Sequence, residues 1–112
     1  DTKAPIGNIT ILDGSRLLIN ISNCLDYYEQ ITEHSLSNRI RYCLYFHISC
    51  LVERLIRKEP ITTCGNLEYF IQTEQTAIQN IKSSFSELEI AYGIDIPDAE
   101  IKYLSDILLE SH

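Results

Sequence analysis

The chain has 112 residues, of which 45% are hydrophobic, and its formal net charge of −7 comes from 16 acidic and 9 basic side chains. This is the size of one ordinary domain, and the hydrophobic fraction is that of a globular protein. Proteins hold nucleic acids mainly through Lys and Arg, so the acidic balance argues against direct binding of DNA or RNA. No apolar run approaches the ~20 residues that cross a bilayer, and the opening residues lack the pattern of a secretory signal. We therefore expect no membrane contact.

The four cysteines are Cys24, Cys43, Cys50 and Cys64. An even number of cysteines in a short chain indicates disulfides only in an oxidising compartment. Because nothing in the sequence indicates secretion, we interpret all four as reduced and three of them as small apolar packing groups. The expected location is cytoplasmic, and no cofactor is predicted.

The first half of the chain predicts two helices. Residues 1–14, which are interrupted by proline and glycine, are expected to form an irregular lead-in to one domain of residues 15–112. Ser15 can cap a first helix that runs to about Gln30. The strongest helix then begins at Ser35 or Ser37 and ends near Lys58, because the residue before Pro60 avoids the helical region.

The second half predicts a short helix, a long helix and a final one. The short helix runs from about residue 66 to 70, and the long one from about 74 to 92, where Gly93 is a natural stop. Pro97 opens the last helix, and acids at its start suit the helix dipole. We find no strand and no internal repeat. The predicted fold is all-α, a compact antiparallel bundle of four main helices and a short one.

Apolar side chains recur at helical spacing along each main helix. The predicted buried positions, in chain order, are Leu18, Ile21, Leu25 and Tyr28; Ile40, Leu44, Leu51 and Leu55; Ala77, Ile78, Ile81, Phe85, Leu88 and Ala91; and Ile101, Leu104 and Leu108.

One stripe of the strongest helix carries the candidate chemistry. At 100° per residue, Cys43, His47, Cys50 and Arg54 fall on one face, beside the apolar positions of that helix. His47 therefore lies within the face that contacts other parts of the protein. Arg54 is seven residues further on, about two turns or ~10 Å along the helix axis.

The residues alone leave four interpretations of His47 open. The commonest is a core histidine whose nitrogens are satisfied. The second is phosphoryl acceptance, because a neutral imidazole keeps one nitrogen lone pair for attack on phosphorus and a nearby guanidinium can pair with the charge. The third is a metal site with Cys43 and Cys50 at i, i+4, i+7 spacing, although structural zinc needs a fourth ligand. The fourth is a Cys–His nucleophilic pair, which lacks an evident third residue or oxyanion hole.

The remaining polar groups have simpler explanations. Five of the nine basic residues lie between positions 39 and 58, which indicates either a solvated helix face or an attraction for a phosphoryl group. His34 and His112 are predicted to be solvated. Most of the acids near the last helix are explained by its N-terminal turn. The basic set is Arg39, Arg41, Arg54, Arg57 and Lys58, and the acidic set is Asp95, Asp98, Glu100 and Asp106.

Two stretches resemble a known family. Residues 45–60, Tyr-Phe-His-Ile-Ser-Cys-Leu-Val-Glu-Arg-Leu-Ile-Arg-Lys-Glu-Pro, contain His47 and, seven residues later, Arg54. Residues 91–104, Ala-Tyr-Gly-Ile-Asp-Ile-Pro-Asp-Ala-Glu-Ile-Lys-Tyr-Leu, follow at the right separation. Both resemble the phosphotransferase-system (PTS) regulation domains, or PRDs, of antiterminators and sugar-operon activators. The amino-acid sequence of the first stretch is most similar to that of the C-terminal PRD of sigma-54-dependent activators of the levanase-operon type.

This resemblance implies a five-helix bundle that commonly forms a homodimer. It also implies that His47 accepts a phosphoryl group from phosphorylated HPr or an enzyme II B component, with Arg54 as a candidate to pair with the phosphate. The domain would catalyse no turnover and would report sugar transport to its parent regulator. Many such domains carry a second histidine seven residues after the closing glutamate, but here that position is Ile107. A domain with one phosphorylation site is therefore expected.

Two rival functions come from other classes. A histidine phosphotransfer bundle relays phosphoryl groups between response regulators and presents its histidine to water. The apolar neighbours of His47 suit that role less well. A purely structural dimerisation module, in which His47 is inert, is the other alternative.

Overall fold

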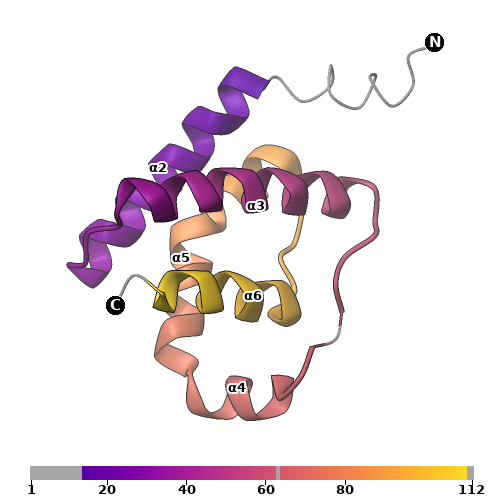
Figure 1. The fold of residues 1–112 in the computed structure, drawn as a ribbon. Helices are drawn as coiled ribbons and strands as arrows, with labels where there is room; N and C mark the ends of the chain where they lie inside the picture. Colours follow the sequence, from indigo (N-terminus) through magenta and orange to yellow (C-terminus); the bar gives the residue numbers. More distant parts are fainter. Residues whose placement is uncertain (1–13, 63, 111–112) are drawn as a thin grey trace.

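The computed structural model describes residues 14–62 and 64–110, and within them the chain forms helices joined by short loops, without strands (Figure 1). The all-α fold is confirmed, and each predicted helix is found within about three residues of its expected bounds, as is usual for helix ends. The helices are α2 Gly14–Thr32, α3 Asn38–Ile56, α4 Leu67–Thr73, α5 Gln75–Tyr92 and α6 Asp98–Leu109. The predicted lead-in of residues 1–14 lies outside the described residues except for Gly14, which begins α2.

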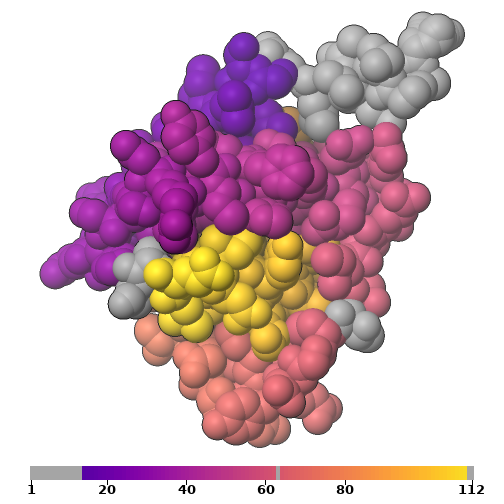
Figure 2. Space-filling view, in the orientation of Figure 1, coloured from indigo at the N-terminus to yellow at the C-terminus, as the bar shows by residue number. Residues whose placement is uncertain are grey.

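The four long helices, α2, α3, α5 and α6, pack against one another. The contact between α2 and α5 is the most extensive in the described chain, and α3 also packs along α6. Figures 1 and 2 both show α6 lying beside α3 on one face of the molecule, while α4 lies on the other side of α6 from α3. None of the described helices is long and apolar enough to cross a membrane.

The core is filled from all five helices. Most predicted apolar positions are buried, among them Ile21, Leu44 and Phe85. Two predictions were wrong: Leu18 is 48% exposed and Ala91 is also exposed. Both residues lie at the margin of the buried face of their helix. A step of three residues falls about 60° short of a full turn, so a side chain three residues from a central buried position is displaced towards the edge of that face.

The structure reveals an internal repeat that the sequence analysis missed. The α2–α3 pair and the α5–α6 pair have the same turn, with residue numbers that differ by 60. In each turn one residue adopts the left-handed conformation, Glu33 with φ 56° and Gly93 with φ 63°. Three residues before the end of the first helix of each pair, a glutamate side chain reaches across the turn. Glu29 Oε2 accepts the backbone N–H of Leu36 at 2.7 Å, and Glu89 Oε2 accepts that of Ile96 at 2.8 Å.

Burial follows the same repeat. Positions that correspond in the two copies are buried in both, namely Ile21 and Ile81, Leu25 and Phe85, Tyr28 and Leu88, Leu36 and Ile96, Ile40 and Glu100, Leu44 and Leu104, and Ile48 and Leu108. Few of these pairs share a residue type, so the repeat is expressed in burial and turn geometry rather than in sequence identity. The two glutamates tie the end of one helix to the start of the next in each copy.

Replacing Glu89 with Ala is expected to lower the free energy of unfolding by about 1–3 kcal/mol, because the buried Ile96 N–H loses its acceptor. Urea unfolding followed by circular dichroism measures this change. The exposed Glu87 lies on the same helix, and its replacement with Ala is the matched control, with an expected effect within about 0.5 kcal/mol. Equal effects of the two substitutions would contradict the role of Glu89.

All four cysteines are free, and Cys24 is the most deeply buried of them. Burial raises the pKa of the Cys24 thiol from its ordinary value of 9.0 to about 11. The folded chain therefore keeps this proton at a pH where the unfolded chain loses it. The resulting contribution to stability is complete below about pH 9 and is lost as the pH rises towards 11.

Cys24 is accordingly expected to resist alkylation at pH 8 under native conditions. The half-buried Cys43 and Cys50 are expected to react, since their sulfurs are less completely covered. Peptide mass spectrometry after treatment with iodoacetamide gives the extent of labelling at each position. Labelling of Cys24 as fast as Cys43 in the folded chain would overturn this expectation.

Candidate functional site

His47 occupies the middle of α3. Ser37 caps the start of this helix, where its side chain accepts the backbone N–H of Ile40 at 3.2 Å. Arg57 forms the C-cap, and Lys58, with φ 63°, turns the chain out of the helix. The helix therefore holds His47 on a rigid element more than two turns from either end.

The imidazole is half-buried, and one of its nitrogens is engaged. Nδ1 of His47 lies 3.2 Å from the hydroxyl oxygen of Tyr103 on α6. The two rings meet edge to face, with centroids 5.3 Å apart and an interplanar angle of 84°. The centroid of the Phe46 ring lies 5.5 Å from that of the imidazole, with an interplanar angle of 73°. The ring is thus oriented by aromatic neighbours without being sealed in the core.

A buried ion pair lies further along the same line of contact between α3 and α6. Arg54 Nη2 is 2.7 Å from Oε1 of Glu100, whose side chain is fully buried. The second carboxylate oxygen, Oε2, accepts the backbone N–H of Ile61 at 2.9 Å. Glu100 therefore joins α6 both to α3 and to the segment that follows Pro60. We refer to His47, Arg54, Glu100 and Tyr103 as the α3–α6 seam.

The explanation of Glu100 as a helix-start acid was incomplete. Glu100 does lie in the first turn of α6, but its carboxylate is buried and paired rather than solvated. The sequence did contain a signal for this burial, because Glu100 lies four residues before Leu104 on the apolar face of the helix. Charged side chains are rarely buried unless they are paired, so this position indicated a buried ion pair. Tyr103 left no comparable signal, because it lies beside that stripe and is 40% exposed.

Arg54 is engaged by Glu100 in this structure. Its side chain is 30% exposed, yet its Nε is the one buried side-chain nitrogen or oxygen in residues 14–62 and 64–110 that has no hydrogen-bond partner. The structure thus brings His47 and Arg54 to one seam, while the ion pair of Arg54 is made with α6. The role of Arg54 towards a phosphate stays a prediction.

Other bases between positions 39 and 58 are also paired. Arg41 contacts Asp26 at 2.9 Å and Glu29 at 3.4 Å, and Arg57 contacts Glu53 at 2.9 Å. In these ion pairs, the positive charges of Arg41 and Arg57 are balanced by neighbouring carboxylates. The cluster is therefore mainly a paired helix surface.

The metal and cysteine interpretations gain no geometric support. Within the described ranges, no group of three or more His, Cys, Asp or Glu side chains is placed to hold a metal ion. The polar group that the structure places against His47 is the hydroxyl of Tyr103, not a cysteine sulfur. Cys43 and Cys50 lie half-buried along the same helix.

The other histidine positions differ from His47. His34 is half-buried in the α2–α3 turn rather than fully solvated, and its backbone N–H donates to the Glu29 carbonyl at 3.3 Å. His112 lies outside the described residues. Ile107 corresponds to His47 in the internal repeat and is 8% exposed. The two positions that carry histidines in many PRDs are therefore equivalent in the fold, and here only the first is a histidine.

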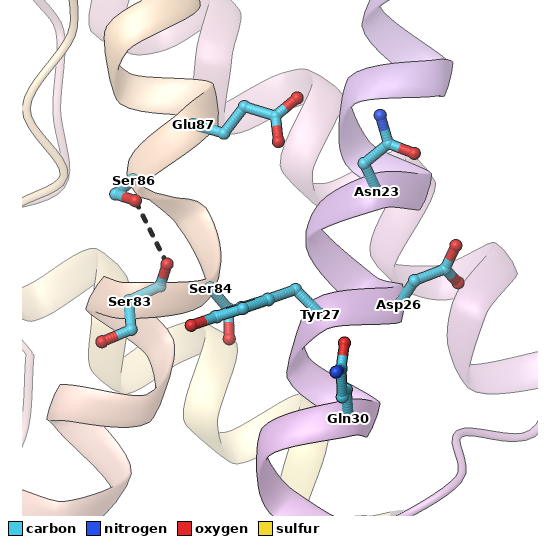
Figure 3. Close-up of a pocket in the computed structure, with 8 residues that line it drawn as sticks. All are labelled: Asn23, Asp26, Tyr27, Gln30, Ser83, Ser84, Ser86 and Glu87. Atoms are coloured by element: carbon cyan, nitrogen blue, oxygen red, sulfur yellow. Dashed lines mark hydrogen bonds between the residues drawn. The ribbon is translucent and has the colours of Figure 1, made fainter.

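A polar groove lies between α2 and α5, apart from the seam (Figure 3). Figure 3 shows side chains from the two helices facing each other across it, and the Ser86 hydroxyl donating to the Ser83 carbonyl, a contact of 3.2 Å. None of the seam residues lines this groove. Its lining residues are Asn23, Asp26, Tyr27, Gln30, Ser83, Ser84, Ser86 and Glu87.

A helical bundle with a half-buried histidine in a helix seam is the kind of regulatory fold that the two sequence stretches indicated. The sequence profile of the PRD domain matches residues 22–111. The chain therefore belongs to the PRD family.

Comparison with curated proteins gives one significant relative. The transcriptional regulatory protein DagR of Salmonella typhimurium (strain 14028s / SGSC 2262) is 28% identical over 104 residues, which cover 92% of this chain. The chain spans 11% of the length of that relative. No solved structure matches the chain significantly.

Proposed function

We propose that residues 15–112 form a non-catalytic, cytoplasmic regulatory domain of a bacterial sugar-operon transcription regulator, and that phosphorylated HPr or an enzyme II B component phosphorylates His47. The observation that carries this proposal is the imidazole in the middle of α3, half-buried, with Nδ1 at the Tyr103 hydroxyl. Membership of the PRD family and the similarity to a transcriptional regulatory protein support it. The amino-acid sequence of residues 45–60 also favours a domain of the C-terminal PRD type from a sigma-54-dependent activator.

The chemistry needs a nucleophile and a place for charge. A neutral imidazole attacks the phosphorus of a phosphorylated donor protein, and the donor nitrogen or sulfur leaves with the electron pair of the broken bond. The phosphohistidine brings about two negative charges to the seam. Such charge is costly at a partly apolar position unless a cation pairs with it. Arg54 is the cation on the same face of α3, where Glu100 contacts its Nη2 and its buried Nε has no hydrogen-bond partner.

This arrangement suggests how the phosphoryl group acts on the fold. A phosphate at His47 would draw on the same guanidinium that pairs with Glu100, and Glu100 also holds the Ile61 backbone. The new charge and the buried carboxylate thus compete for one guanidinium. We propose that the outcome changes the packing of α3 on α6 and, through it, the parent regulator.

A homodimer is part of the same proposal. Several large apolar side chains are exposed on the described surface, and Tyr42 and Phe46 lie on α3 close to His47, at 74% and 65% exposure. Exposed aromatic groups are typical of surfaces that contact a partner. A partner copy at this face would sense a change at the seam directly.

Phosphoryl transfer to the purified chain tests the proposal. The chain is incubated separately with phosphorylated HPr, with phosphorylated enzyme II B and with a response regulator loaded by acetyl phosphate. We expect acid-labile, alkali-stable label from one of the first two donors and none from the response regulator. Label from the response regulator alone would identify a phosphotransfer relay instead, and no label from any donor would indicate a structural module.

A further inference from the structure

We propose that Tyr103 is a positioning residue that occupies Nδ1 of His47 and makes Nε2 the nitrogen that accepts the phosphoryl group. The inference deepens the proposed function and rests on it for its biological meaning. The geometry of the ring itself can be tested without a protein donor.

The position of the Tyr103 hydroxyl is fixed by its neighbours on α6. Leu104, the next residue, is buried in the core, and Glu100, three residues earlier, is held by Arg54 and by the Ile61 backbone. The hydroxyl is therefore brought to Nδ1 by a helix that is anchored on both sides of Tyr103. The 3.2 Å contact and the edge-to-face rings place it against one nitrogen of the imidazole.

Access to the two ring nitrogens is consequently unequal. An attacking nitrogen must approach phosphorus along its lone pair, at roughly 3–3.5 Å before the bond forms. At Nδ1 that space is filled by the Tyr103 oxygen. The lone pair of Nε2 points away from this hydroxyl, so attack from Nε2 does not require the contact with Tyr103 to break.

Attack from Nε2 requires one direction of the hydrogen bond between Tyr103 and His47. In the reactive tautomer, Nδ1–H donates to the Tyr103 oxygen, and Nε2 carries the lone pair. A bond forms between Nε2 and phosphorus while the bond between phosphorus and the donor atom breaks, and the departing atom keeps its electron pair. The proton stays on Nδ1, where the Tyr103 oxygen stabilises the positive charge that develops on the ring. This is the tautomer-setting role that a second hydrogen bond to histidine commonly has.

The tautomer can be measured in the unphosphorylated chain. Two-bond ¹H–¹⁵N correlation NMR on the uniformly ¹⁵N-labelled protein distinguishes a protonated ring nitrogen from an unprotonated one. We expect the neutral ring of His47 to carry its proton mainly on Nδ1. Tyr103→Phe is expected to shift the population towards the Nε2–H tautomer, while Tyr69→Phe, at an exposed position on α4, leaves it unchanged. A dominant Nε2–H tautomer in the wild-type chain would overturn the assignment.

The site of attachment gives a second, independent readout. Phosphoramidate, a small P–N donor that releases ammonia, phosphorylates accessible histidines without a partner protein. At short reaction times we expect the Nε2 isomer of phosphohistidine at position 47 in the wild-type chain. Tyr103→Ala is expected to raise the share of the Nδ1 isomer at least several-fold, with Tyr69→Ala as the matched control. Isomer-resolved ³¹P NMR reports both species.

These outcomes separate the inference from the proposed function. An isomer ratio that is the same in the wild-type chain and Tyr103→Ala, or a wild-type product mainly at Nδ1, contradicts the role of Tyr103. An Nε2 product from phosphoramidate, together with no transfer from HPr or enzyme II B, supports the ring geometry and rejects the proposed function.

Discussion

Replacing Glu100 with Leu is expected to destabilise the domain by about 3–5 kcal/mol, the usual cost of removing one partner of a buried ion pair. The substitution leaves the partly buried guanidinium of Arg54 without its anion and the Ile61 N–H without its acceptor. A domain of this size is stable by only about 5–15 kcal/mol, so the loss is a large share of the total. Urea unfolding followed by circular dichroism gives the change.

The double substitution Arg54→Leu with Glu100→Leu is the informative control. Because it removes both charges, it is expected to cost less than Glu100→Leu alone. Glu100→Gln keeps an oxygen for the Ile61 N–H and is expected to fall between the wild-type chain and Glu100→Leu. Two results would contradict a stabilising role of the ion pair at the seam. One is a cost of Glu100→Leu under about 1 kcal/mol, and the other is a double variant whose effect equals the sum of those of Glu100→Leu and Arg54→Leu.

Replacing His47 with Gln in the full-length parent is expected to abolish the response of its target operon to sugar. Glutamine has a similar size and polarity but no nucleophilic ring nitrogen, so the phosphoryl group has nowhere to attach. A transcriptional reporter measured with and without the transported sugar then gives the same output in both conditions.

His34→Gln is the matched control, since His34 lies in the α2–α3 turn and not at the seam. It is expected to leave the sugar response intact. Circular dichroism on the isolated domain checks that His47→Gln folds. A folded His47→Gln variant that still responds to sugar as the wild-type protein does would contradict the assignment of His47.

Helical periodicity was enough to predict the elements of this fold. Apolar spacing located the main helices, and Pro60 and Gly93 marked helix ends for stereochemical reasons that need no tertiary information. The left-handed φ of Gly93 bears this out. His47 was singled out because it interrupts a regular apolar stripe with a group that can do chemistry.

The partners of His47 could not be predicted in the same way. A helical wheel shows which residues share a face of one helix, but not which faces of two helices meet when they are about 50 residues apart in the chain. The contacts of His47 with Tyr103 and of Arg54 with Glu100 depend on that long-range pairing. The internal repeat was missed for a related reason, since Ile40 and Glu100 occupy the same buried place with opposite chemistry.

Locating the phosphoryl group tests most directly whether His47 is the phosphorylated residue. The chain is phosphorylated by the donor that labels it best, digested at alkaline pH and sequenced by electron-transfer mass spectrometry, which preserves the P–N bond. We expect the modification to lie on His47 and to disappear in His47→Gln. Modification at His34, or label of equal extent in the His47→Gln chain, would contradict it.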